Sequence, residues 1–170
     1  MNAPKFRIET VRSRKVRSKL MTVRLSLARE PEHPGGSLAH GYAFVAPLDQ
    51  AGKLDAGLWA RRRDDCRVTR FSPDGPAAFG ILAHRRGGAG GATWGFEFDA
   101  TGTTEVDLGY RLDLHRFRSG DYVTVSHQGE NHTYRIDAVR PYAPEERMDS
   151  LAPLCPTAAT LRASLDRAVA

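Results

Sequence analysis

One segment decides the fold class, residues 117–139, FRSGDYVTVSHQGENHTYRIDAV. Residues 122–127 and 132–139 alternate between apolar and polar side chains with the period of two that half-buried strands show. The polar loop 128–131 between them contains a glycine, so the segment predicts a β-hairpin with a four-residue loop. Because His127 and His132 flank that loop, they are expected to lie opposite each other.

This register would place six side chains on one face of the hairpin, since side chains change face at every residue. Val125 would oppose Tyr134, and Val123 would oppose Ile136. The pattern therefore indicates an apolar core face with two imidazoles at its rim.

Short alternating segments also recur along the rest of the chain. They predict strands at 6–8, 19–28, 41–48, 67–71, 78–84, 93–99 and 105–114. In the segment 19–28, one face is apolar, and the other is expected to be wet, with Thr22, Arg24 and Ser26. The segment 105–114 alternates through Val106, Leu108, Tyr110, Leu112 and Leu114. Many closely spaced strands favour a mainly β fold, a single-domain antiparallel β-barrel or sandwich.

Two helices are expected beside the strands. Asp55 is a suitable N-cap for a short internal helix over 56–65. Thr157 would cap a C-terminal helix over 157–169, whose spacing places Leu161, Leu165 and Val169 on one face. We therefore expect a barrel domain over 1–142 and a C-terminal helical extension over 143–170 packed on it.

The composition limits the class of protein. The chain has 170 residues, of which 41% are hydrophobic and 26% charged, as in an ordinary globular domain. No apolar run approaches the roughly 20 residues that a bilayer-spanning helix needs, and no signal-peptide pattern is present. We expect a cytoplasmic protein without membrane contact, in which Cys66 and Cys155 are reduced and unpaired.

Charge is distributed unevenly along the chain. The first 29 residues carry nine basic side chains and one acidic, a net charge of +8, so the remainder is −3 within a total of +5. Such asymmetry is typical of a chain that meets a polyanion. The candidate contact residues are Arg12, Arg14, Lys15, Arg17 and Lys19. The alternative is a solvated outer face, because Phe6 is the only aromatic ring among residues 1–41 that could stack on a base.

The two hairpin histidines are the candidate metal ligands. Cross-strand neighbours have Cβ atoms about 5 Å apart, close enough for His127 and His132 to bind one metal ion. A third ligand would have to come from His84, His115, Glu130 or Asp137. The alternative is that both are polar side chains at a hairpin tip.

No catalytic residue and no resident cofactor is predicted from the residues themselves. There is no Gly-x-Ser-x-Gly elbow. Cys66 follows two aspartates, which would raise rather than lower the pKa of its thiol.

One stretch resembles a known family. Phe117, the run Gly120-Asp121-Tyr122-Val123 and Tyr134 are similar to the flavin-binding barrel of the ferredoxin-reductase-like family, which has a phenylalanine, a Pro-Gly-Gln-Tyr-Val turn and a later Arg-x-Tyr-Ser/Thr that touches the flavin. This chain departs from that pattern at Ser119, Asp121, His132 and Arg135. The likeness covers about twenty residues, and no nicotinamide-binding half follows it. The resemblance implies a barrel that holds flavin.

The expected function is that of a small non-enzymatic binding or accessory module, whose partner is a protein or a polyanion. The C-terminal helix is a candidate for homo-oligomer contact. The alternative is a ligand-binding barrel that holds flavin, or a metal ion at His127 and His132.

Overall fold

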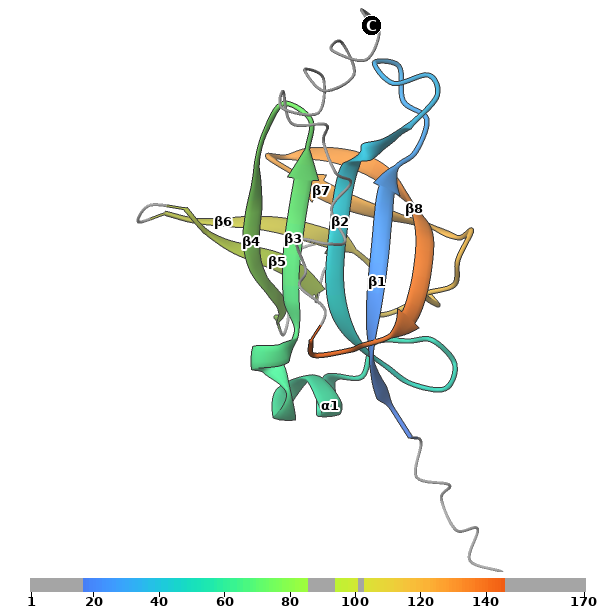
Figure 1. The fold of residues 1–170 in the computed structure, drawn as a ribbon, viewed down its shortest axis with the longest axis vertical. Helices are drawn as coiled ribbons and strands as arrows, with labels where there is room; N and C mark the ends of the chain where they lie inside the picture. The colour runs from blue at the N-terminus through green and yellow to red at the C-terminus, as the bar shows by residue number, and fades with distance from the viewer. Residues whose placement is uncertain (1–16, 86–93, 101–102, 146–170) are drawn as a thin grey trace, which may run out of the picture.

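Eight antiparallel strands close into one barrel (Figure 1). The structure, a computed structural model, describes residues 17–85, 94–100 and 103–145. Each strand pairs with its neighbours in the chain, and β1 closes the barrel by pairing with β8. The strands are β1 Lys19–Leu27, β2 Ser37–Leu48, β3 Arg67–Ser72, β4 Gly75–His84, β5 Trp94–Ala100, β6 Thr103–Tyr110, β7 Tyr122–His127 and β8 Glu130–Pro141. The prediction of a mainly β, antiparallel barrel is confirmed.

A short helix, α1 Ala56–Arg61, follows β2 and leads into the 3-10 turn η1 Arg63–Asp65. Asp55 caps it as predicted, because its Oδ1 accepts hydrogen bonds from the backbone N–H groups of Gly57 and Leu58. The Trp59 indole donates to the Leu82 carbonyl at 2.8 Å and so fixes α1 to the end of the barrel. Neither of these described helices has the length and apolar content that a membrane span requires.

Two predicted elements fall outside the described residues. They are the strand at 6–8 and the C-terminal helix at 157–169 with Leu161, Leu165 and Val169.

Aromatic side chains fill the interior of the barrel. Phe96 lies 4.9 Å from Phe44 and 5.0 Å from Tyr42 between ring centroids. Trp94, Phe96 and Phe98 are all buried, as the alternation of 93–99 predicts. Aliphatic residues from β1, β4, β7 and β8 complete the core: Val23, Leu25, Leu82, Val123, Val125 and Ile136.

The outer face of β1 differs from the prediction. Thr22 and Ser26 are 2% and 3% exposed, so the expectation of a wet face is wrong at these two positions. Ser26 donates to Asp137 Oδ1 at 2.9 Å, and the Arg24 guanidinium lies 3.7 Å from Asp137 Oδ2. Ser26 and Arg24 thus have a partner on β8, the Asp137 carboxylate.

The β7–β8 hairpin has a tighter turn than predicted. Gln128 and Gly129 form a two-residue turn with φ values of 51° and 87°, which suits the twist of the strands. His127 therefore pairs with Glu130, and His132 with Val125. The register moves by two residues, which preserves the face of every side chain. The apolar face is therefore confirmed, whereas the His127–His132 pairing is wrong.

In strand β6, the apolar residues lie on the outer face of the barrel, whereas apolar side chains usually face the core. Asp107 pairs with the inward-facing Phe96, so the side chains of Glu105 and Asp107 point into the barrel, and Gly109 lies on the same face of the strand. Leu108 and Tyr110 face outward and are 38% and 48% exposed. The strand ends at Tyr110, because Arg111 adopts a φ of 49° and turns the chain. This inversion places two carboxylates inside the barrel.

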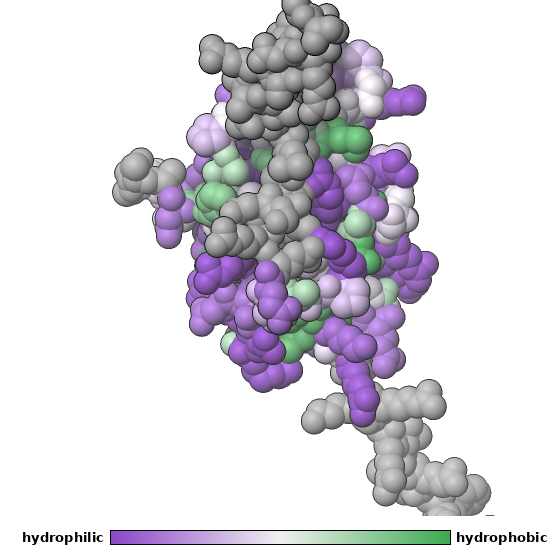
Figure 2. Space-filling view, viewed as in Figure 1, coloured by the Kyte–Doolittle hydropathy of each residue, from purple (hydrophilic) through white to green (hydrophobic). Residues whose placement is uncertain are grey.

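The described surface in the view of Figure 2 is mainly hydrophilic, with small, separate hydrophobic areas.

Candidate functional site

The barrel has two mouths, and each contains a cavity. The α1 mouth lies where β1 begins and β2 and β8 end, beside α1 (Figure 1). The hairpin mouth lies at the other end, where β7 turns into β8.

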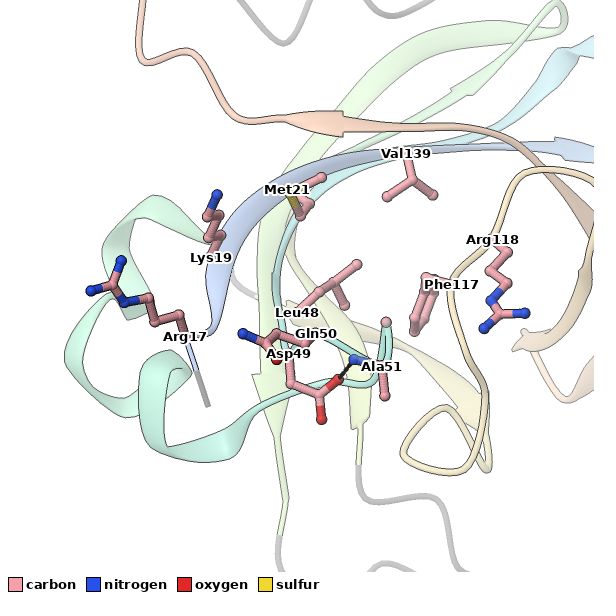
Figure 3. Close-up of a pocket in the computed structure, with 11 residues that line it drawn as sticks. Arg17, Lys19, Met21, Leu48, Asp49, Gln50, Ala51, Phe117, Arg118 and Val139 are labelled. Carbon is pink, nitrogen blue, oxygen red and sulfur yellow. Dashed lines mark hydrogen bonds between the residues drawn. The ribbon is translucent and has the colours of Figure 1, made fainter. Parts of the chain in front are cut away.

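The cavity at the α1 mouth has a volume of about 530 Å³, which falls within the usual range for small-molecule sites. Met21 from β1, Leu48 from β2 and Val139 from β8 form its apolar part (Figure 3). Phe117 lies beside them and contacts Phe44 edge to face, with the ring centroids 6.0 Å apart. An apolar group can therefore enter the end of the barrel here.

Three cationic side chains surround this apolar part. Figure 3 places Arg17 and Lys19 on one side of the cavity and Arg118 on the other. Within the described part of the chain, none of the three forms a salt bridge or a side-chain hydrogen bond. The one lining carboxylate, Asp49, accepts from the backbone N–H groups of Ala51 and Lys53 at 2.8 and 2.9 Å and so stabilises its own turn.

Local sequence explains how the two sides of this mouth are joined. Gly52 has a φ of 81°, a conformation that favours glycine, and its carbonyl accepts a hydrogen bond of 2.8 Å from Phe117 N. The turn after β2 is thus tied to the segment that carries Arg118. Lys19 pairs with Leu48 at the start of β1, which places it on the same face of the sheet as Met21.

The hairpin mouth contains a buried network centred on Asp107, whose side chain is fully buried. The Tyr42 hydroxyl donates to Asp107 Oδ2 at 2.8 Å, and Arg70 Nη1 donates to the same oxygen at 3.0 Å. His127 Nδ1 lies 2.8 Å from the other carboxylate oxygen, Oδ1. Burial raises the pKa of Tyr42, with Tyr134 and Asp107 adding to the effect, so this hydroxyl remains a donor.

Arg70 joins the two carboxylates of β6. It donates to Glu105 through Nη1 and Nη2, at 3.0 and 2.9 Å, and its guanidinium lies 4.7 Å from the ring centroid of Phe98. The hydrogen bond from Arg70 lowers the pKa of Glu105. Burial alone would lower the pKa of Arg70, but its bonds to Glu105 and Asp107 outweigh burial and raise it.

Glu105, Asp107 and His127 also form the one group of potential metal ligands found among the described residues, with ligand atoms within 4.8 Å of one another. Arg70 Nη1 lies 3.0 Å from an oxygen of each carboxylate and 3.1 Å from His127 Nδ1. The guanidinium nitrogen therefore occupies the position that a cation would take in this triad.

The two predicted metal ligands, His127 and His132, contact different residues. His127 belongs to the Asp107 network, whereas His132 Nδ1 lies 3.0 Å from Glu30 Oε2. Of the proposed third ligands, His84 packs against Trp94, Asp137 bonds to Ser26, and the Glu130 side chain is 83% exposed. His115 forms no hydrogen bond with another described side chain.

The predicted basic residues are only partly described. Arg17 and Lys19 lie at the α1 mouth, while Arg12, Arg14 and Lys15 lie outside the described residues. Of the positions that carry the flavin resemblance, Tyr134 is buried in the barrel and Tyr122 is 54% exposed.

Sequence reasoning did not find Arg70, Glu105, Asp107 or Arg118. One signal was available, since Glu105 and Asp107 are two residues apart and must share a face of their strand. That Arg70 and His127 meet this face depends on barrel closure, which no spacing in the sequence reveals.

No protein-family model, curated protein or solved structure matches this chain.

Proposed function

We propose that the protein is a ligand-binding barrel that takes an amphipathic anion at its α1 mouth. One observation carries the proposal, a cavity of about 530 Å³ that has an apolar part and a rim with three cationic side chains and one carboxylate that is already hydrogen-bonded. The apolar body of the ligand would lie against Met21, Leu48 and Val139. Its anionic head would lie at the rim.

Each part of the cavity favours a different part of this ligand. Burial of an apolar chain contributes about 0.8 kcal/mol per methylene group. A hydrogen bond to a charged group contributes on the order of 1.5–3 kcal/mol when it is sheltered, and less at an exposed rim. Affinity is therefore expected to depend mainly on the apolar body, and selectivity mainly on the charge.

The test is calorimetric titration with decanoate, compared with 1-decanol and decyltrimethylammonium, which share its apolar chain. Decanoate is expected to bind more tightly than the alcohol, and the cationic ligand least tightly. Equal binding of decanoate and the alcohol, or absence of decanoate binding, would contradict the proposal.

Variants locate the site. Lys19→Ala combined with Arg118→Ala is expected to weaken decanoate binding about tenfold, because two charge contacts at the rim are removed. Arg116→Ala is the matched control, since it removes an exposed arginine from the same segment that does not line the cavity. An equal effect of Arg116→Ala would show a general charge effect instead of a site.

Polyanion binding by the basic N-terminal region is a second candidate, favoured by the net charge of +8 over the first 29 residues. Retention on heparin and affinity for duplex DNA would then fall steeply with salt, with a log–log slope of roughly 0.9 per phosphate contact. Replacement of Arg12, Arg14 and Lys15 by Ala would flatten that slope and leave decanoate binding unchanged. Arg118→Ala would do the reverse, so the two functions are separable.

A barrel that holds flavin, or a metal ion at His127 and His132, remains the alternative, and the absorbance spectrum of the purified protein tests for flavin and coloured metals. A protein partner, or self-association through the predicted helix at 157–169, would be detected as a mass above that of the monomer in sedimentation.

A further inference from the structure

We propose that His127 is a general base at the hairpin mouth. Its substrate is a small molecule that has an acidic C–H or O–H bond and an acceptor atom that takes up the negative charge when the proton leaves. This inference concerns the opposite end of the barrel from the α1 mouth and does not depend on the function proposed there. It rests on the contacts of the imidazole ring and on the cavity that His127 lines.

The contacts of His127 assign the position of its proton. Asp107 Oδ1 lies 2.8 Å from His127 Nδ1, and an ionised carboxylate only accepts hydrogen bonds, so Nδ1 must carry the hydrogen. Arg70 Nη1 also lies 3.1 Å from Nδ1, but Nη1 has two hydrogens and donates at the shorter distance of 3.0 Å to both Glu105 and Asp107, so it does not require a lone pair on Nδ1. In the neutral ring, Nε2 then keeps its lone pair and has no hydrogen-bond partner in the described part of the chain.

The network also fixes the orientation of the ring. Asp107 is fully buried and is held by Tyr42 and Arg70, while Arg70 is in turn held by Glu105 through two nitrogens. An imidazole anchored through Nδ1 to a positioned carboxylate presents Nε2 in one direction, the arrangement by which enzymes prepare a histidine to accept a proton.

The ring borders a cavity of suitable size and chemistry. A cavity of about 300 Å³ lies at this mouth, with His127, Arg70, Tyr134, Phe71 and His40 among its lining residues. Arg70 uses both Nη1 hydrogens and one on Nη2, which leaves Nε–H and one Nη2–H without partners in the described chain. His40 Nδ1 is buried with no hydrogen-bond partner among these residues. The two unpaired N–H groups of Arg70 are thus available beside the base to stabilise a developing anion.

The proposed step is a proton abstraction. A C–H or O–H bond of the ligand breaks, and its proton passes to His127 Nε2. The electron pair moves to an acceptor atom of the same molecule, where the free N–H groups of Arg70 stabilise the negative charge. No oxidant, reductant or second substrate is needed.

The probe for this step is 5-nitrobenzisoxazole, which loses its ring proton to a base while its N–O bond breaks, and yields a coloured phenolate. The wild-type protein is expected to exceed the rate of an equal concentration of free imidazole. His127→Ala should lower kcat/KM about 10²-fold, the lower end of the range for a positioned base. Added imidazole should restore part of the rate. His115→Ala is the control, because it removes a histidine that does not line this cavity.

Asp107→Asn tests the positioning residue. It should lower kcat with little change in KM. Tyr42 and Arg70 both donate to Oδ2 and so keep the amide oxygen at that position, which turns the NH2 group towards His127 Nδ1 and favours hydrogen on Nε2. A wild-type rate equal to free imidazole, or a His127→Ala variant as active as the parent, would overturn the proposal.

A measurement on the wild-type protein keeps the proposal testable if these variants do not fold. Long-range ¹H–¹⁵N correlation spectra should show neutral His127 with its hydrogen on Nδ1. Hydrogen on Nε2 instead would overturn it.

Discussion

At the scale of single residues, Asp107 is the one charged residue that is fully buried in the described part of the chain. Removing a carboxylate from water is costly unless hydrogen bonds and an opposite charge replace the solvent. Asp107 has three such contacts, with Tyr42, Arg70 and His127, and Glu105 adds a second negative charge beside Arg70. Arg70 is therefore the residue on which the hairpin-mouth network depends.

Replacement of Arg70 should expose this dependence. Arg70→Ala is expected to lower the free energy of unfolding by on the order of 3 kcal/mol, because it leaves a buried carboxylate without its counter-charge. It also vacates the centre of the triad Glu105, Asp107 and His127, so Zn²⁺ should raise the Tm of the variant.

The control is Arg85→Ala, which breaks the more exposed ion pair with Glu97 and should cost less than about 1 kcal/mol. Thermal unfolding with Zn²⁺ and with a chelator provides the measurement. If Zn²⁺ stabilised the wild type as much as the Arg70→Ala variant, Arg70 would not be the cation of this triad.

At the scale of elements, the β7–β8 turn sets the register of the strand that carries His132. A two-residue turn with positive φ at both positions matches the twist of the strands, and Asn-Gly is its preferred sequence. Gln128 has a φ of 51°, a backbone conformation that β-branched residues such as valine would tolerate poorly.

Substitutions at Gln128 should follow this preference. Gln128→Asn is expected to raise the free energy of unfolding by about 0.5–1 kcal/mol, and Gln128→Val to lower it, because asparagine tolerates the left-handed region and β-branched residues do not. Urea unfolding measures both variants. Gln50→Asn, in an exposed turn without positive φ at that position, is the control and should have little effect. Equal stability of the two Gln128 variants would contradict this account of the turn.

At the scale of the whole molecule, each end of the closed barrel has a carboxylate whose ionised form is stabilised by hydrogen bonds. Asp55 at the α1 end accepts hydrogen bonds from Ser18 and from the first turn of α1, and these lower its pKa. The hydrogen bond from Arg70 lowers the pKa of Glu105 at the other end.

These shifts predict the direction of acid unfolding. A carboxyl whose pKa is lower in the folded state stabilises the protein above the pKa of the unfolded chain, about 4, and that contribution is lost as the pH falls further. The Tm should therefore fall below about pH 4. The combined variant Asp55→Asn and Glu105→Gln should have a lower Tm at pH 7 and a smaller loss of Tm between pH 7 and pH 2.

Asp64→Asn, at an exposed carboxylate, is the control and should leave the profile unchanged. An unaltered pH profile in the double variant would show that other groups cause the acid sensitivity.

The periodicity of the sequence alone predicted where most of the described strands lie and which side of most of them faces the core. The alternation in 93–99 and 122–139 identified inward-facing Trp94, Phe96, Val123 and Ile136, because apolar side chains at a period of two lie on one face whatever their partners are. The N-cap at Asp55 could also be predicted from the local sequence, since a carboxylate directly before a helix accepts hydrogen bonds from the free N–H groups of its first turn.

Only the tertiary structure decided which face of β6 is inside. Its apolar residues favoured the opposite face, but pairing with β5 sets Asp107 opposite Phe96, and a partner from another strand, Arg70, makes the buried charge tolerable. The clustering of Lys19 and Arg118 at one mouth likewise joins residues about 100 positions apart. Such contacts depend on closure and register, which are properties of strand pairs, whereas sequence patterns report one strand at a time.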